Sequence, residues 1–289
     1  MNSHRASALI IISAACIVMV RAVPPRLLIL PSDGANHPTK INLTVIENHA
    51  VPNPDGEHRH AYLAVVSHAS PNFHVYGPGA GRGNCSIDGG VATVRATAGR
   101  HGCRFATNGG PFNMPPGNGS CIGATVSDGA TLSGFSGSSA PGIGLTRDGR
   151  WVLGTVANAS EASALGLVQL VTGFNWLVYN ATNAVAKAGG EAAPRTAAGV
   201  DAQGRLLMLE VDGCEECKSG KGPTMREMGR LLVRLGAVAA VNLDGGGSST
   251  AVARAGDARG APVRLLNHPT CNDTLTLCER NVTSVLCVT

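Results

Sequence analysis

The sequence predicts an α+β fold: a single β-rich, mixed-sheet domain with a few short helices, stabilised by disulfides. The first observation is a series of short apolar runs separated by turns rich in Gly, Asn and Pro. The second is one helical pattern between two strand-like runs, which forms a strand-helix-strand crossover. The third is the set of nine cysteines; one, Cys16, lies in the first segment, and the remaining even number suits disulfides.

The chain begins with a segment typical of secretion. Residues 1–22 are predicted to be a signal peptide, because residues 8–20 are apolar and Val20-Arg21-Ala22 is an acceptable cleavage site. An uncleaved anchor reaching toward Leu30 is the alternative. Residues 23–60 lack periodicity and predict an N-terminal arm, a propeptide-like segment or a loosely packed first strand, and residues 61–289 form the main domain.

Seven glycosylation sequons support a luminal or secreted location. Each Asn is followed two residues later by Ser or Thr, which the secretory pathway recognises. They are Asn42, Asn84, Asn118, Asn158, Asn180, Asn272 and Asn281. We therefore expect the protein to be located in the lumen of the secretory pathway (Golgi) or to be secreted.

Local signals place the elements of the main domain in order. Strands are predicted around residues 62–66, 73–76, 104–107, 142–146, 151–156 and 168–180, a helix at 91–100, and a surface loop at 181–193. Gly102 closes the helix, and Asp148-Gly149 between two apolar runs indicates a hairpin. The strand at 104–107 breaks at Asn108-Gly109-Gly110, where an amide meets paired glycines.

The clearest unit covers residues 205–250. A buried-strand run at 205–211 ends before Asp212, and Thr224 with Glu227 forms a capping box for a helix that Gly236 closes. A second strand, 237–243, ends before Asp244. Two such strands should be parallel, joined by a right-handed crossover, so both carboxylates emerge at one edge. The strands would lie about 5 Å apart as neighbours, or about 10 Å apart with one strand between them.

Asp244 is followed by Gly245, Gly246 and Gly247, which is the composition of an anion-handling site. Glycines allow positive φ and let several N–H groups point toward one position, beside a carboxylate that could act as base or nucleophile. An ordinary tight turn is the alternative.

Composition and spacing argue against several classes of protein. The net charge of +4 comes from scattered Lys and Arg, so nucleic-acid binding has little support. His residues have no ligand spacing, so we expect neither a metal nor another cofactor. A metal-dependent phosphatase or nuclease would show clustered His and Asp ligands.

Five stretches together resemble the phosphodiester glycosidase family. They are residues 108–114 (NGGPFNM), 121–129 (CIGATVSDG), 195–199 (RTAAG), 212–213 (DG) and 241–248 (VNLDGGGS). The likeness covers about residues 62–289, and makes 61–289 the expected catalytic domain. The resemblance implies a glycoside hydrolase that removes α-linked N-acetylglucosamine from GlcNAc-1-phospho-mannose, uncovering mannose 6-phosphate in lysosomal enzyme targeting, or from a related sugar phosphodiester. The partner would be a glycan or glycoprotein carrying that phosphodiester.

The resemblance also implies disulfides between Cys85 and Cys121, Cys103 and Cys287, and Cys271 and Cys278. The even count favours a further local disulfide between Cys214 and Cys217. The printed sequence ends at Thr289 without the C-terminal membrane anchor of vertebrate members, so we expect no such anchor.

Site roles follow from the resemblance and the chemistry of phosphate leaving groups. We expect Asp244 to attack C1 or activate water, with Asp212 as alternative or partner. A guanidinium and an N–H concavity suit phosphate, so Arg195 and the backbone from Gly245 to Gly247 would bind it. Further candidates for substrate binding are Asn108, Gly109, Gly110, Asn113, Asp128, Thr196, Asn242 and Ser248.

Structural alternatives stay open for several of these candidates. Asp128 could be an Asp-Gly turn, Asn108 and Asn242 could cap strand ends, and Arg195 could form a structural ion pair. A secreted carbohydrate-binding protein without turnover is the alternative function, and a homo-oligomer is left open.

Overall fold

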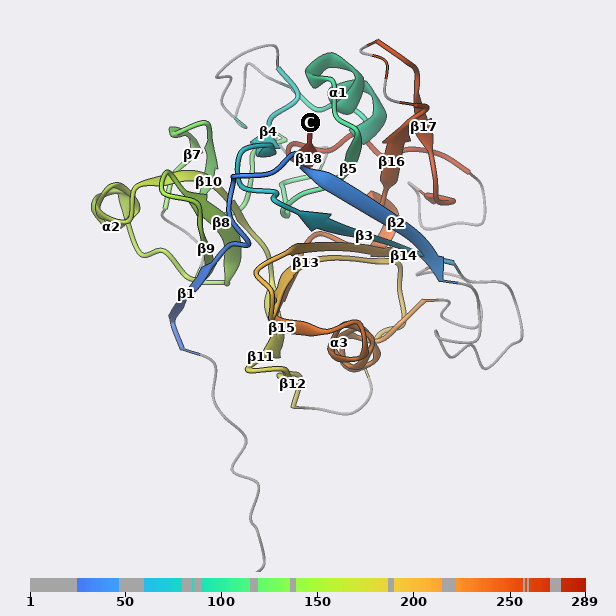
Figure 1. Ribbon diagram of the computed structural model, residues 1–289. Coiled ribbons are helices and arrows are strands. Elements are labelled where there is room, and N and C mark those ends of the chain that lie inside the picture. The colour runs from blue at the N-terminus through green and yellow to red at the C-terminus, as the bar shows by residue number, and fades with distance from the viewer. Residues whose placement is uncertain are drawn as a thin grey trace, which may run out of the picture.

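A computed structural model describes residues 25–46, 60–79, 85, 90–114, 119–135, 139–186, 190–214, 222–256, 258, 260–270 and 277–289. These residues fold into three β-sheets with short α-helices on their outer faces (Figure 1). The predicted β-rich α+β class is confirmed.

The first sheet has six strands in the order β1-β9-β8-β10-β6-β7. Their bounds are β1 Leu27–Pro31, β6 Thr125–Ser127, β7 Ala130–Ser133, β8 Gly142–Thr146, β9 Arg150–Gly154 and β10 Leu167–Thr172. β8 and β9 form the hairpin predicted from Asp148-Gly149, with Gly149 at φ 79°. Glycine suits that turn because it adopts positive φ without a Cβ penalty.

The second sheet has seven strands in the order β12-β11-β15-β13-β14-β3-β2. Their bounds are β2 Lys40–Ile46, β3 Ala61–Ser67, β11 Asn175–Tyr179, β12 Thr182–Asn183, β13 Arg195–Asp201, β14 Leu206–Val211 and β15 Ala237–Asn242. The third sheet has the order β17-β16-β5-β18-β4. Its bounds are β4 Phe73–Tyr76, β5 Phe105–Asn108, β16 Ala251–Arg254, β17 Val263–Leu265 and β18 Val285–Val288.

The helices are α1 Val94–His101, α2 Ala159–Ala164 and α3 Met225–Arg234, with a 3-10 turn, η2, at Gly246–Ser248. Gly102 ends α1 in the left-handed conformation, as predicted. The capping box of Thr224 and Glu227 begins α3, and Gly236 follows its end at φ 91°.

The crossover unit has the predicted direction, and its two strands have one strand between them, which is the second of the two predicted spacings. β13 pairs antiparallel with both β14 and β15, so these two strands run parallel to each other with β13 between them. The pairs between named strands are antiparallel, so the sheets are antiparallel rather than mixed in their hydrogen-bonded neighbours. The carboxyl ends of β14 and β15 therefore lie toward one edge.

The main core lies where the three sheets meet. One face of the seven-stranded sheet, with Met208 and Val241, packs against Trp151 of the first sheet and Phe105 of the third. The opposite face is covered by α3, whose Met228 and Leu232 are fully buried (Figure 1). Since burial of such side chains removes most of their apolar surface from water, these contacts stabilise the sheet arrangement.

The segment before residue 60 contributes more than an arm. β1 pairs along β9, and β2 pairs with β3 over seven residues from Lys40 to Ile46, so both strands extend sheets of the main domain. Residues 1–22, the predicted signal peptide, lie outside the described residues. No helix among the described residues is long and apolar enough to cross a membrane.

Two predicted disulfides are confirmed: Cys85 with Cys121 and Cys103 with Cys287. Cys214 and Cys278 are also disulfide-bonded. Their predicted partners, Cys217 and Cys271, lie outside the part of the chain that the structure describes.

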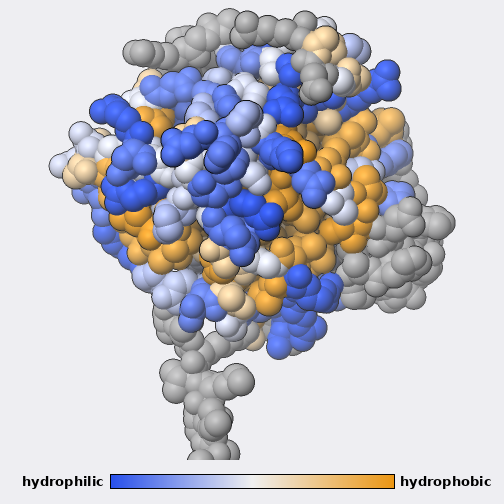
Figure 2. Space-filling view, in the orientation of Figure 1, coloured by the Kyte–Doolittle hydropathy of each residue, from blue (hydrophilic) through white to orange (hydrophobic). Residues whose placement is uncertain are grey.

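Strand β2 forms an exposed edge of the seven-stranded sheet. Its Leu43 is 37% exposed and Val45 50% exposed. Figure 2 shows hydrophobic surface over this region. An edge strand with exposed apolar side chains can pair with another chain, so the homo-oligomer stays a prediction.

Candidate active site

The candidate site is built around the loop between β15 and β16. β15 ends at Asn242, and the chain then passes through Asp244 and the 3-10 turn η2 before β16 begins at Ala251. The N–H of Asp244 donates to the Gly109 carbonyl over 3.0 Å. This bond joins the loop to the Gly-rich segment after β5, so two sequence motifs more than a hundred residues apart meet in space.

Asn108 holds both ends of this loop. Its Nδ2 donates to the Asp244 carbonyl over 2.8 Å, and its Oδ1 accepts from the Thr250 N–H at 3.1 Å. The Thr196 hydroxyl donates to the same Oδ1 over 2.7 Å. Asn108 and Thr196 are fully buried. They therefore position Asp244, and the strand-end alternative for Asn108 describes the geometry better than a sugar contact.

Close packing explains the glycines beside Asp244. A Cβ on Gly245 would lie 2.9 Å from the Pro194 carbonyl oxygen, and Gly246 has φ 57°. The Gly246 N–H donates to that same carbonyl over 2.9 Å. A side chain at Gly245 would therefore push the loop away from the segment that leads into β13, and one at Gly246 would strain a backbone conformation that suits glycine.

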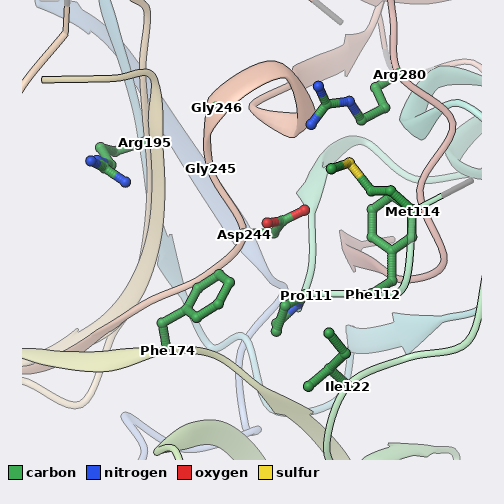
Figure 3. Close-up of a pocket in the computed structure, with 10 residues that line it drawn as sticks. All are labelled: Pro111, Phe112, Met114, Ile122, Phe174, Arg195, Asp244, Gly245, Gly246 and Arg280. Atoms are coloured by element: carbon green, nitrogen blue, oxygen red, sulfur yellow. The ribbon is translucent and has the colours of Figure 1, made fainter. Parts of the chain in front are cut away.

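A cavity of about 290 Å³ opens beside Asp244. Figure 3 shows its lining residues, with the Asp244 carboxylate among them. The lining consists of Pro111, Phe112, Met114, Ile122, Phe174, Arg195, Asp244, Gly245, Gly246 and Arg280. This volume is at the lower end of the range for small-molecule sites, so it suits a small ligand rather than a long polymer.

Two guanidinium groups line the cavity with Asp244. Arg195 begins β13 and donates from Nη2 to the Glu191 carbonyl over 2.9 Å. Arg280 approaches from the segment before β18, where its Nη1 donates to the Ser248 hydroxyl over 3.4 Å. Figure 3 shows Arg195 on one side of the Gly245–Gly246 segment and Arg280 on the other. Arginine forks match the oxygens of a phosphate.

Arg280 was not predicted from the sequence. It is not among the five family-like stretches, and its neighbours provide no motif. The cavity also has an apolar wall that was not predicted. Three of its members are partly exposed: Met114 at 52%, Ile122 at 37% and Phe174 at 43%. Apolar walls of this kind are common in small-molecule sites.

Four of the predicted site residues line the cavity: Asp244, Arg195, Gly245 and Gly246. The others do not. These are Asp212, Asn108, Gly109, Gly110, Asn113, Asp128, Thr196, Asn242, Gly247 and Ser248. Gly109 and Gly110 are buried where a Cβ would lie within 2.5 Å of Ser284 Oγ and 2.2 Å of the Thr172 carbonyl oxygen, respectively.

Three polar candidates have local partners. The Asn113 amide donates to the Ser120 hydroxyl over 2.7 Å, and the Asn242 amide donates to the Leu243 carbonyl over 2.8 Å. Asp128 lies in the turn between β6 and β7 with φ 46°, as an Asp-Gly turn requires. Its carboxylate accepts from Gln169 Nε2 over 2.6 Å and lies 2.9 Å from His74 Nδ1.

Asp212 faces a different group of residues from Asp244. Its Oδ1 accepts from the His268 N–H over 3.0 Å and from Asn267 Nδ2 over 3.2 Å. Glu210 lies two residues earlier on the same face of β14 and is fully buried. Burial raises the pKa of Glu210 well above its ordinary value, and the charge of Asp212 raises it further. Burial also raises the pKa of Asp212.

Among the described residues, no group of three or more His, Cys, Asp or Glu is arranged to hold a metal ion. The cavity brings together one carboxylate, which can attack an electrophilic carbon or accept a proton, and two guanidinium groups, which can bind an anion.

The family profile described as phosphodiester glycosidase matches residues 101–289. The chain belongs to the phosphodiester glycosidase family.

The relatives within that family share one name. The chain is 33% identical over 271 residues to the N-acetylglucosamine-1-phosphodiester alpha-N-acetylglucosaminidase of Mus musculus, which covers 82% of this chain and 50% of the relative. It is 33% identical over 236 residues to the Homo sapiens protein of that name, covering 75% of this chain and 43% of the relative. This chain therefore spans about half the length of these relatives.

A solved structure has the same fold. The catalytic domain of zebrafish N-acetylglucosamine-1-phosphodiester alpha-N-acetylglucosaminidase, auto-inhibited by its pro-peptide, superposes with a TM-score of 0.74 at 25% identity. The match covers 91% of this chain and 88% of that chain. A hypothetical protein from Synechocystis, at 15% identity and a TM-score of 0.59, shares the fold alone.

Proposed function

We propose that this protein hydrolyses a glycosyl phosphodiester, releasing α-linked N-acetylglucosamine and leaving a phosphomonoester. The observation that carries the proposal is one carboxylate, Asp244, lining a sugar-sized cavity together with Arg195 and Arg280. The family membership and the names of the relatives support the choice of sugar and linkage. The finer substrate that we propose is GlcNAc-1-phospho-mannose on a glycoprotein, in the secretory pathway.

In this mechanism Asp244 acts at C1 of the sugar, either as nucleophile or as base for a water molecule. The bond between C1 and the phosphate oxygen breaks, its electron pair leaves with the phosphate, and water supplies the oxygen that ends on C1. The proton released by water passes to Asp244 or to solvent. A phosphate ester is already a good leaving group, so the site has less need of a strong general acid than sites for ordinary glycosides.

The two arginines bind the phosphate as it leaves. Charge grows on its oxygens as the C1–O bond breaks, and positioned guanidinium groups stabilise that charge. The Gly246 N–H is committed to Pro194. The arginines therefore carry more of this role than the Gly-rich backbone that the sequence suggested.

The test of this function is a comparison of two substrates that share the same sugar. We expect release of N-acetylglucosamine from an N-acetylglucosamine-1-phosphodiester, and little release from the matching simple α-glycoside. Sugar release is measured by chromatography with purified protein. Binding of the phosphodiester without release would instead support the carbohydrate-binding alternative, and equal cleavage of both substrates would refute the phosphate-centred mechanism.

The arginines allow a second prediction. Arg195→Lys and Arg280→Lys should each reduce kcat/KM for the phosphodiester by about tenfold or more, because an ammonium group cannot form the two parallel bonds of a guanidinium fork. Steady-state kinetics measures the effect. Arg150→Lys is the matched control, since Arg150 pairs with Asp148 on the surface hairpin between β8 and β9. A site variant with kinetics like the control would remove that arginine from the phosphate site.

A further inference from the structure

We propose that Asn267 is a positioning residue, which holds the loop that carries Asp244 through hydrogen bonds to the loop backbone. In this proposal, the gain or loss of one proton on the buried pair Glu210 and Asp212 controls whether those hydrogen bonds form. The inference rests on the proposed function, because it assigns a role to residues behind the same cavity. Neither Asn267 nor Glu210 lines that cavity. Both act through the backbone of the loop.

The side-chain amide of Asn267 forms hydrogen bonds with the backbone where the loop leads into β16. Its Oδ1 accepts from the Ala251 N–H over 2.9 Å, and its Nδ2 donates to the Ser249 carbonyl over 3.0 Å. The side chain is 7% exposed. A buried amide that satisfies backbone groups on both sides of one residue holds that backbone firmly, because breaking either bond leaves a buried polar group unpaired.

These hydrogen bonds are linked to Asp244 through Thr250 and Asn108. Thr250, the residue between those two bonds, donates its N–H to Asn108 Oδ1, and Asn108 Nδ2 donates to the Asp244 carbonyl. The η2 turn is held in the same way, since the Ser249 N–H donates to the Gly246 carbonyl over 3.1 Å. A shift at Ser249 therefore moves the Gly-rich segment and the catalytic carboxylate together.

The side-chain amide of Asn267 has fewer N–H hydrogens than there are acceptor oxygens around it. Its Nδ2 has two hydrogens, yet three oxygens lie in range: the Ser249 carbonyl, Glu210 Oε1 at 3.0 Å and Asp212 Oδ1 at 3.2 Å. Ionised carboxylates are stronger acceptors than a peptide carbonyl. Two ionised carboxylates would therefore compete with Ser249 for the amide, whereas one neutral carboxyl leaves a hydrogen for Ser249.

The surroundings favour one proton on the acid pair. Glu210 is fully buried, and its Oε2 has no hydrogen-bond partner among the described residues. The titratable groups that face the pair are Tyr62 on β3, His60 just before β3 and His268 beside Asn267. Burial and the charges of Asp212 and Glu210 raise the pKa of Tyr62 to about 12, so it stays neutral. An unpaired carboxylate in this position is costly, and because both acids approach the same Asn267 amide, the charge of one opposes ionisation of the other.

The direction of the pH effect follows from the raised pKa values. Glu210 keeps its proton in the folded protein at pH values where the unfolded chain has lost it. The folded state then binds more protons, so its stability falls as pH rises from the unfolded pKa toward the folded pKa. Over the upper part of this pH window both acids of the pair become ionised. The Asn267 amide then donates to the two carboxylates rather than to the Ser249 carbonyl, so the loop is held less firmly.

The experiment uses Glu210→Gln, which mimics the neutral acid, and Asn267→Ala, which removes the hydrogen bonds to the loop backbone. In the wild-type protein we expect kcat/KM to fall as pH rises through the pKa of the pair. Glu210→Gln should lose this alkaline fall and keep activity. Asn267→Ala should lower kcat at least tenfold below the pKa of the pair, since small displacements of a catalytic group cost this much, and the difference from the wild type should shrink above that pKa. Asn183→Ala is the control, because Asn183 also bridges backbone groups, at Arg226 and Val185, on β12.

Hydrogen exchange of the Gly245 to Ser249 amides separates this inference from the proposed function, because it needs no substrate. Protection relative to the intrinsic rate should fall with rising pH in the wild type, stay level in Glu210→Gln and be low throughout in Asn267→Ala. An alkaline loss of protection that persists in Glu210→Gln would overturn the inference, as would equal effects of Asn267→Ala and Asn183→Ala. Absence of sugar release with these exchange patterns intact would refute only the hydrolase.

Discussion

Asp244→Asn should abolish sugar release, lowering kcat on the order of 10³-fold or more, while the protein folds and is secreted normally. An amide has nearly the same shape as a carboxylate, so it fits the same place in the cavity. It can neither attack C1 nor accept the proton of water. The backbone bonds that hold residue 244, to Asn108 and Gly109, involve no carboxylate atom and are retained.

Single-turnover kinetics with an N-acetylglucosamine-1-phosphodiester measures this loss, and circular dichroism checks the fold. Asp148→Asn is the matched control, since Asp148 is an exposed carboxylate in the turn between β8 and β9. Asp212→Asn belongs in the same series as the competing candidate. Near-normal turnover in Asp244→Asn together with complete loss in Asp212→Asn would transfer the catalytic role to Asp212.

The largest effect on stability is expected from removal of the disulfide between Cys103 and Cys287. Cys103→Ala combined with Cys287→Ala should lower the free energy of unfolding by about 2–5 kcal/mol. The bond joins positions separated by 184 residues, so it restricts the unfolded chain strongly. It also ties the start of β5 to β18, and β5 ends at Asn108, which holds Asp244.

Unfolding by denaturant, carried out on the wild type and the variant under the same non-oxidising conditions, measures this change. The matched control is the pair Cys85→Ala and Cys121→Ala, whose positions are only 36 residues apart. Because the loop it closes is shorter, removal of this disulfide should lower the free energy of unfolding by about 1.5 kcal/mol less. If removal of the shorter link proved the more costly of the two, loop closure would not be the main source of the stabilisation.

Local patterns were sufficient where neighbouring residues decide the structure. The capping box at Thr224 and Glu227 predicted the start of α3, and Asp148-Gly149 predicted a hairpin. The segment before residue 60 was less informative. β1 and β2 are partly exposed edge strands: the short apolar run of β1 lies close to the predicted signal peptide, and β2 mixes apolar with polar residues.

The site was predictable only in part. The sequence identified Asp244 and its glycines, and the crossover argument brought the ends of β14 and β15 to one edge. The direction of each side chain does not follow from the direction of its strand. Asp212 follows the alternation of β14 and faces Asn267 with Glu210, whereas the chain at Asp244 has already left the sheet and crosses to Gly109.

The sequence by itself determined the β-rich class, the direction of the crossover, two confirmed disulfides and the carboxylate beside the Gly-rich turn. These depend on patterns of residues close together in the chain, or on motifs of the family. Only the tertiary structure decided that Arg280 and Phe174 join Asp244 in one cavity, and that Asn108 and Asn267 hold its loop. Those contacts depend on strand order and register across three sheets, and the energy that sets them comes from packing between distant segments, which leaves no local pattern to read.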